Sequence, residues 1–312
     1  MGEIFSTFTT RKEEVMYWQI PVMCRVIIGY MIAPALIKKI ATAPSRTRSL
    51  VWQYFFSAVF ALSIALIAGA NLWETRVIAV AIIGAFNAFA CYCHWRAVDI
   101  SLSRTSLFTQ ADDLICLALG YIILGEGKFL STWLGIGLTL SLVSVSIFTF
   151  AKTRTPKADN AQKPEQKKWT IGIWVMLYSV IWGVAVFSMR YFSLQGMSLP
   201  GYIAAWYSGS YIGALVVFLL GGKKEAGAPL KRAQILRVAP LSLVIWLSLM
   251  SVYWAKMLAP ITVVQPIFQV SEMIFPTLIG LWIFKEAKEM NIWSRLAIVL
   301  GLAGGTIIAL SF

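Results

Sequence analysis

The chain has 312 residues, of which 59% are hydrophobic and only 13% are charged, and its mean hydropathy is +0.74. A soluble domain carries about 25% charged residues, so the charged side chains here are too few to cover a soluble protein of this size. The net charge of +13 does not indicate nucleic-acid binding, because the basic residues lie in short connections between apolar runs. We therefore expect an all-α integral membrane protein whose surface contacts the lipid bilayer.

Ten apolar runs come close to the roughly 20 residues that a helix needs to cross the hydrocarbon core. They cover approximately residues 15–37, 50–70, 76–98, 104–124, 130–151, 170–190, 200–220, 237–258, 261–284 and 291–311. The polar segment 152–168, which carries charges and two prolines, is typical of a flexible linker. The sequence thus predicts five transmembrane helices on each side of a central linker.

An internal repeat relates the two groups of helices. An offset of 159 residues pairs Trp95 with Trp254, Ser103 with Thr262, Ser106 with Gln265, Gln110 with Gln269 and Asp113 with Glu272. We predict a first repeat over residues 1–155, a basic linker over 156–168 and a second repeat over 169–312. Because each repeat holds an odd number of spans, the second enters the membrane from the opposite side, which makes the two inverted repeats suited to alternating access.

The distribution of lysine and arginine predicts the orientation. Odd-numbered connections hold 17 of these residues, whereas even-numbered connections hold Arg76, Lys128, Arg190 and Lys256. The positive-inside rule then places the odd connections in the cytoplasm and both termini outside. We expect the plasma (inner) membrane of a bacterium to be the location.

Two carboxylates within apolar runs, Asp113 and Glu272, are the first candidates for function. A charge at the bilayer centre costs at least about 2.5–3.5 kcal/mol, and a carboxyl group removed from water takes up a proton more readily. Ser106, Gln110 and Asp113 share the spacing of Gln265, Gln269 and Glu272, and each set lines one face of its helix. We predict that both faces line a central cavity as cation or proton sites. The alternative is that these side chains bond one helix to another.

Arginines and aromatic residues complete the candidate substrate site. Arg25 lies well inside the first run and is a candidate partner for a substrate carboxylate, for Asp113 or for Glu272. Arg96 lies near the end of the third run, where an arginine can also extend to the interface. Aromatic candidates for stacking on an organic cation or a ring are Tyr92, Trp95, Tyr178, Trp182, Trp206, Tyr207 and Trp254.

No metal or cofactor is expected. Cys91 and Cys93 flank Tyr92 beside His94, the only histidine, but one cluster on one helix supplies too few ligands spread around an ion. The small number of candidate bases and nucleophiles also argues against an intramembrane enzyme that acts on lipid.

The duplicated pattern resembles the EamA-type repeat of the drug/metabolite transporter superfamily. Segments 95–145 and 254–308 each run from an aromatic-rich helix end through an apolar helix to a short turn, Gly125-Glu126 in the first and Lys285-Glu286 in the second. Trp182-Gly183 resembles the family's first-helix signature. The first repeat departs from the pattern: it has no Trp-Gly in its first helix, and Leu107 and Leu117 stand opposite Pro266 and Pro276. Members of the family are commonly drawn with cytoplasmic termini, opposite to the orientation that the connection charges favour.

The resemblance implies a secondary transporter for small organic solutes. Carboxylates and an in-membrane arginine favour a small zwitterionic or cationic metabolite that resembles an amino acid, moved by a monomer or weak dimer, with proton coupling as one option. Three alternatives stay open: an exporter of quaternary ammonium, nucleoside-like or drug-like compounds, a receptor or assembly subunit that transports nothing and, more remotely, an intramembrane lipid-modifying enzyme.

Overall fold

A computed structural model of the chain describes residues 17–41, 45–102, 105–106, 109–129, 131–150, 166–221, 229–285 and 292–310. These residues are almost entirely helical, and no strand occurs among them. The expected all-α class is therefore confirmed for the part of the chain that is described.

The helices follow the apolar runs closely. The first run folds into three consecutive pieces, α1 (Gln19–Arg25), the π-helix η2 (Val26–Ile32) and α2 (Ala33–Ala41). The rest of the first half forms α3 (Arg46–Ile67), α4 (Thr75–Ile100), α6 (Gln110–Ile123), the short 3-10 helix η3 (Glu126–Phe129) and α7 (Thr132–Phe150). The second half forms α8 (Gln166–Leu194), α9 (Leu199–Leu220), α11 (Arg232–Leu258), α12 (Ile261–Trp282) and α13 (Ile292–Leu310).

Seven of these helical segments are long and apolar enough to cross a membrane. Within the described residues they are Gln19–Ile40, Arg46–Ile67, Thr75–Ile100, Gly172–Leu194, Leu199–Leu220, Arg232–Leu258 and Ile261–Trp282. Large apolar side chains such as Ile67, Leu220 and Trp282 remain exposed on the bundle surface, where hydrocarbon would surround them. The chain has the helices of a multi-pass membrane protein.

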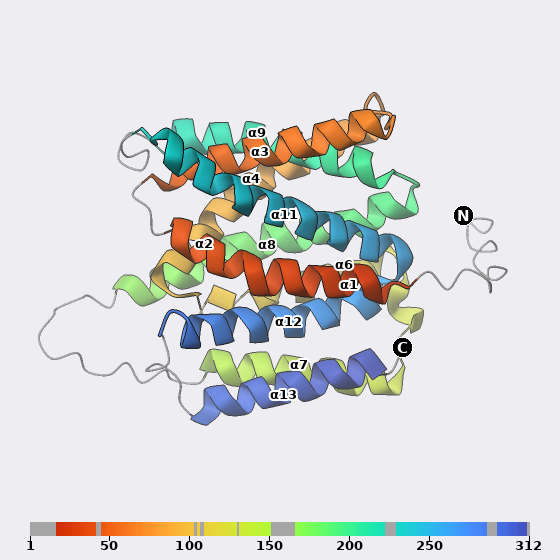
Figure 1. Cartoon of the computed structure of the whole chain (residues 1–312). Coiled ribbons are helices and arrows are strands. Elements are labelled where there is room, and N and C mark those ends of the chain that lie inside the picture. The colour runs from red at the N-terminus through yellow and green to blue at the C-terminus, as the bar shows by residue number, and fades with distance from the viewer. Residues whose placement is uncertain are drawn as a thin grey trace, which may run out of the picture.

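The helices run side by side with alternating direction (Figure 1). We call the end of the bundle that holds the connections at 68–74, 195–198 and 259–260 the hairpin end. The opposite end, where α7 stops and α8 starts, is called the linker end. Helix α4 packs on α8 and α9, α11 packs on α3 and on α1, and α7 packs on α13 at one edge of the molecule.

Glycines allow the closest of these contacts. A Cβ atom at Gly209 or Gly213 of α9 would overlap the carbonyl oxygen of Ala81 or Ala85 in α4. A Cβ at Gly84 of α4 would in turn overlap the carbonyl oxygen of Trp206. Small residues let two membrane helices approach until their backbones touch, where van der Waals packing replaces the missing hydrophobic force. This contact fixes α9, and with it Trp206, against α4.

The turn between α8 and α9 shows how local sequence sets a helix boundary. Gly196 has a φ of 77°, a left-handed conformation that glycine adopts readily and that ends α8. Ser198 then caps α9, its hydroxyl accepting a hydrogen bond from the Gly201 amide at 3.3 Å, and Pro200 follows in the first turn.

The fourth run differs from the expected unbroken helix over 104–124. The Thr105 and Thr109 amides donate to the carbonyl groups four residues earlier, but a turn at Thr109 separates this stretch from α6. Asp112 and Asp113 therefore lie in the first turn of α6 and not near the middle of a long helix. Acidic residues stabilise a helix N-terminus, and an oxygen of Asp112 accepts a hydrogen bond from the Asp113 amide at 3.0 Å.

Candidate functional site

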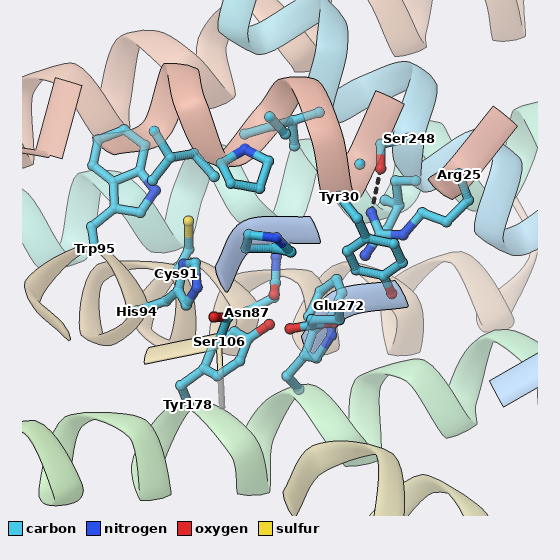
Figure 2. A pocket seen from close by; sticks show the side chains of 18 of the residues that line it. Arg25, Tyr30, Asn87, Cys91, His94, Trp95, Ser106, Tyr178, Ser248 and Glu272 are labelled. Carbon is cyan, nitrogen blue, oxygen red and sulfur yellow. Dashed lines mark hydrogen bonds between the residues drawn. The ribbon is translucent and has the colours of Figure 1, made fainter. Parts of the chain in front are cut away.

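A pocket lies inside the bundle and has a volume of about 130 Å³ (Figure 2). For scale, an apolar cavity of about 150 Å³ can hold benzene. Both halves of the chain contribute to its wall, which includes Arg25, Tyr30, Ile37, Tyr54, Asn87, His94, Trp95, Leu102, Ser106, Tyr178, Trp182, Trp206, Tyr207, Ser248 and Glu272. The pocket is therefore a junction of segments that are far apart in the sequence.

Arg25 and Glu272 are the charged residues of the pocket wall (Figure 2). The Arg25 guanidinium donates a hydrogen bond to Ser248 and lies 4.4 Å from the ring centroid of Tyr30. Its Nε is buried and has no hydrogen-bond partner among the described residues. The ion pairs of the described chain do not join Arg25 to Glu272; they are Arg46–Asp99, Arg76–Glu74 and Arg190–Glu126. The two opposite charges thus attract each other within one pocket without forming a direct ion pair.

The backbone of the first span sets the position of Arg25. The α-helix ends at this residue and a π-helix follows through Ile32; single turns of π-helix occur often at functional sites. Gly29 lies under the side chain, and a Cβ there would come within 2.7 Å of a guanidinium nitrogen and would overlap the Ser248 hydroxyl. The glycine therefore leaves the space that the arginine occupies.

Glu272 comes from α12, where it is 8% exposed and lies beside the side chains of Thr109 and Tyr30. In Figure 2 the Tyr178 hydroxyl points toward this carboxyl group. Tyr30 is thus next to both charged residues: its ring face lies against the Arg25 guanidinium, and its side chain lies beside the Glu272 carboxyl group. A ligand with a positive and a negative group could meet both at once.

Aromatic rings form a continuous wall beside the charges. The His94 and Tyr178 ring centroids are 4.7 Å apart, Tyr178 stacks on Trp182 at 6.1 Å with 15° between the planes, and Trp182 meets Trp206 edge-on at 6.1 Å. The Trp95 indole nitrogen in the same wall is buried and has no partner among the described residues. Ring faces can attract a cation, and an unpaired buried donor indicates a position for a ligand or water.

Eight of the residues predicted to line a cavity or to bind a ligand line this pocket: Arg25, Trp95, Ser106, Tyr178, Trp182, Trp206, Tyr207 and Glu272. The predicted faces of the fourth and ninth runs do not enter it as a whole. Gln265 instead donates a hydrogen bond to Asp113, and the buried amide of Gln269 has no partner among the described residues. The side chain of Gln110 lies outside the described part of the structure.

Three other predicted residues lie outside the pocket lining. The Arg96 guanidinium lies 5.3 Å from the ring centroid of Tyr92 and 4.9 Å from that of Trp174. Trp254 is 39% exposed on the outer surface of α11, although its repeat partner Trp95 is fully buried in the pocket wall. The repeat offset therefore does not predict which tryptophan faces the cavity.

Several lining residues were missed by sequence reasoning. Tyr30, Asn87 and Ser248 carried no signal beyond being polar residues in apolar runs, and the sole histidine, His94, was considered only as a metal ligand. The Asn87 amide donates to the Tyr54 hydroxyl at 3.1 Å, so a polar wall joins α3 and α4. No group of His, Cys, Asp and Glu among the described residues is arranged to hold a metal ion.

Comparison with known proteins supports the fold and leaves the function open. No family model matches the sequence. No curated protein matches it either. Among solved structures 28 chains match, including one crystal structure with a TM-score of 0.64 and 13% sequence identity, over 94% of this chain and 96% of that one. This likeness shows that a similar helical fold occurs in a solved structure, and at that identity it concerns the fold alone.

Proposed function

We propose that the chain is a secondary transporter for a small zwitterionic or cationic organic metabolite and not an enzyme. The observation that carries this proposal is a pocket within membrane-span helices that holds Arg25 and Glu272, not joined in an ion pair, beside a wall of aromatic rings. Ionisable residues inside a membrane mark substrate or ion pathways as a rule. A zwitterion would place its carboxylate at Arg25 and its ammonium at Glu272.

The proposed architecture has ten spans, with α6, α7 and α13 crossing the membrane beside the seven longer helices. The pattern of helix packing supports two inverted repeats. If the halves are equivalent, α4 corresponds to α11, α9 to α3 and α8 to α1. The contact of α4 with α9 then has its counterpart in that of α11 with α3, and the contact of α4 with α8 in that of α11 with α1. All four contacts occur. Contacts between corresponding helices of the two halves also occur, namely α7–α13, α6–α12 and α3–α9.

The EamA-type resemblance remains part of this proposal. Trp182-Gly183, its first-helix signature, has a physical role here: a Cβ at Gly183 would come within 2.7 Å of the Asp112 carbonyl oxygen, and Trp182 lines the pocket. The glycine lets α8 approach the start of α6. We place the protein in the inner membrane of a bacterium, with odd connections in the cytoplasm.

A cation without a carboxylate is the second candidate substrate, because the aromatic wall would suit a quaternary ammonium group. A thermal-shift screen of the purified protein against amino acids, amines, nucleosides and choline-like compounds separates the two classes. Zwitterions should raise the melting temperature more than their esters, which lack the carboxylate.

Transport itself is tested by counterflow in proteoliposomes with the best ligand of the screen. We expect flux with the parent protein and its loss in Glu272→Gln, whereas Glu74→Gln, which changes a carboxylate 37% exposed at the hairpin end, should behave like the parent. Absence of flux for every amino acid and amine tested, with no change in ligand binding in Glu272→Gln, would contradict the proposal.

A further inference from the structure

A second cluster of buried charged and polar residues lies beside the pocket. We call it the latch, and it consists of Asp113, Glu126, Arg190, Lys256 and Gln265. All five are less than 7% exposed, and Lys256 is completely buried. None of them lines the pocket.

One part of the latch centres on Glu126. The Arg190 Nε donates to one oxygen of this carboxylate at 3.0 Å, and the Ile261 amide at the start of α12 donates to the other at 2.8 Å. A terminal nitrogen of Arg190 also donates to the Lys256 carbonyl oxygen at 2.6 Å, near the end of α11. Glu126 in η3 is thereby connected to α8, α11 and α12.

The other part centres on Lys256. Its ammonium group donates to the Gln265 side-chain oxygen at 2.5 Å and lies 3.8 Å from the Cys116 sulfur. The Gln265 side-chain nitrogen donates to Asp113 in α6. The amide thus connects a buried cation to a buried carboxylate.

The latch joins the two halves of the chain. Asp113 and Glu126 belong to the first half, and Arg190, Lys256 and Gln265 belong to the second. Movement of one half against the other at this point would separate opposite charges. In a membrane protein such a separation is tolerable only if water enters to solvate them.

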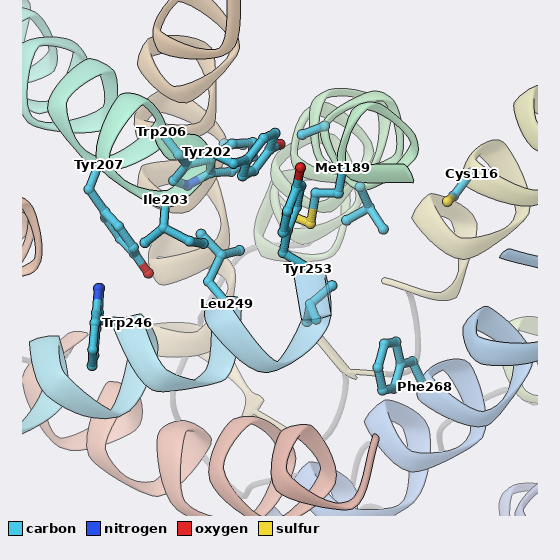
Figure 3. Close-up of a cluster of buried hydrophobic side chains, with 14 of the residues drawn as sticks. Cys116, Met189, Tyr202, Ile203, Trp206, Tyr207, Trp246, Leu249, Tyr253 and Phe268 are labelled. Atoms are coloured by element: carbon cyan, nitrogen blue, oxygen red, sulfur yellow. The ribbon is translucent and has the colours of Figure 1, made fainter. Parts of the chain in front are cut away.

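The latch lies between the pocket and the hairpin end. Glu126, Arg190 and Lys256 are all near the ends of their helices at that side. Close-packed aromatic residues fill the same region, with Tyr202 stacked on Tyr253 at 4.2 Å and the Tyr253 hydroxyl donating to the Met197 carbonyl oxygen at 2.7 Å (Figure 3). The pocket lining instead extends toward the linker end, through Ile37 and Leu102.

We propose that the latch is the gate that holds the hairpin end closed, so that this conformation exposes the pocket only toward the linker end. The inference rests on the proposed transport function, since a gate needs a second conformation in which it is open. Arg190 and Lys256 are then gate residues, and the substrate meets neither of them in the closed conformation.

The test measures access to each end directly and needs no identified substrate. The four native cysteines, Cys24, Cys91, Cys93 and Cys116, are replaced by alanine. One reporter cysteine is then placed in the pocket (Ala33→Cys) or at the hairpin end, at Met197, which is 4% exposed (Met197→Cys). A membrane-impermeant maleimide is applied to each side of the membrane separately. With the latch intact, the Ala33 reporter should react from the linker-end side and the Met197 reporter from neither.

Arg190→Gln should open the hairpin end. We expect labelling of the Met197 reporter from the hairpin-end side to rise roughly five-fold or more, within the range of typical coupling free energies. Labelling of the Ala33 reporter from the linker-end side should fall together with it. Arg76→Gln is the matched control, because Arg76 also reaches the other half, at the Gln195 carbonyl oxygen, but is 41% exposed, and exposed contacts contribute little.

Unchanged labelling in a folded Arg190→Gln protein would overturn the proposal, and so would faster labelling of both reporters, which indicates general loosening. If Arg190→Gln does not fold, Gln265→Leu is used in its place, because it removes the connection between Lys256 and Asp113. The labelling rates of the Ala33 and Met197 reporters are then compared in the same way. If Arg190→Gln raises the labelling rate of the Met197 reporter and lowers that of the Ala33 reporter, but no solute is transported, the gate is supported and the transport function is rejected. If a solute is transported but the labelling rates do not change, the transport function is supported and the gate is rejected.

Discussion

The placement of Arg25 shows how one residue can be held charged inside an apolar bundle. A guanidinium at mid-membrane costs at least about 2.5–3.5 kcal/mol on insertion scales. Here the hydroxyl of Ser248 accepts one of its hydrogen bonds and the face of Tyr30 lies against it. These contacts leave Nε unpaired among the described residues. The arginine is thus fixed in position while it keeps a donor for a ligand.

Replacement of Arg25 by lysine tests this donor. Lysine keeps the charge but loses the planar set of donors that matches a carboxylate. We expect the best zwitterionic ligand of the screen to bind roughly tenfold more weakly or worse, a loss of about 1.4 kcal/mol. Isothermal titration measures the change, and Arg96→Lys, outside the pocket, is the control. Equal losses in the two variants would contradict a direct contact at Arg25.

Gly29→Ala tests the space beneath the arginine. The added methyl group would displace Arg25 or Ser248, and overpacking of this kind costs about 1–3 kcal/mol. We expect weaker ligand binding in calorimetry together with a lower melting temperature. Gly172→Ala is the control, because a Cβ there meets no atom within 4 Å. Parent-like affinity in Gly29→Ala would show that Arg25 does not need its present position.

The repeat-related tryptophans Trp95 and Trp254 allow a matched comparison. Only Trp95 lines the pocket, where its indole nitrogen has no partner among the described residues, whereas Trp254 is 39% exposed. We expect Trp95→Phe to weaken ligand binding several-fold, since a hydrogen bond contributes about 0.5–1.5 kcal/mol, and Trp254→Phe to leave it unchanged. Tryptophan fluorescence quenching by the ligand, measured in both variants, gives the affinities. An equal loss of affinity in the two variants would contradict a direct contact between Trp95 and the ligand.

The sequence predicted the charged residues of the pocket better than its neutral ones. An arginine or glutamate in an apolar run requires compensation wherever it lies, so Arg25 and Glu272 could be selected without a structure. Ser248 and His94 belong to the site only because they contact residues of other helices, Arg25 and Tyr178, and such contacts cannot be seen in the sequence. Gln265 had the same helical spacing as Ser106, yet it faces Asp113 and not the pocket.

At the scale of helices, the contact between α4 and α9 depends on glycine in both partners. Gly209→Ala would place a methyl group on the Ala81 carbonyl oxygen, and backbone cannot move aside as a side chain can. We expect a loss of about 1–3 kcal/mol in unfolding free energy, measured as a lower melting temperature in detergent. Gly135→Ala, where a Cβ meets no atom within 4 Å, should leave the melting temperature near the parent value. No difference between the two would mean that α4 and α9 separate easily.

Most helix boundaries followed from apolar run length, but the turn at Thr109 did not. The predicted run was extended back to residue 104 although the residues around Thr109 are mostly polar, so the break in the apolar pattern there was overlooked. Asp113 was interpreted as a charge near the middle of a helix, although acidic residues are also typical of a helix start. The run over 261–284, by contrast, forms one continuous helix, α12, although Pro266 and Pro276 lie inside it.

At the scale of the whole molecule, the buried arginine and lysine of the latch change the charge count behind the orientation. Arg190 and Lys256 were two of the four basic residues assigned to even connections, but they are 6% and 0% exposed and are bound within the protein. Because the positive-inside rule concerns residues of loops, only Arg76 and Lys128 remain in the count for the even-numbered connections. The asymmetry between odd and even connections is therefore larger than the sequence suggested.

This larger asymmetry predicts that the hairpin end faces away from the cytoplasm. Fusion of alkaline phosphatase after Phe312 should give an enzyme that is active outside the cytoplasm, and fusion of a green fluorescent protein at the same point should give no fluorescence. Adding lysines at Asn71 and Trp73, in the α3–α4 connection at the hairpin end, should weaken the preference, because it brings basic charge to that end. Fluorescence without phosphatase activity in the parent protein would place both ends of the chain in the cytoplasm, and the latch would then close the cytoplasmic side.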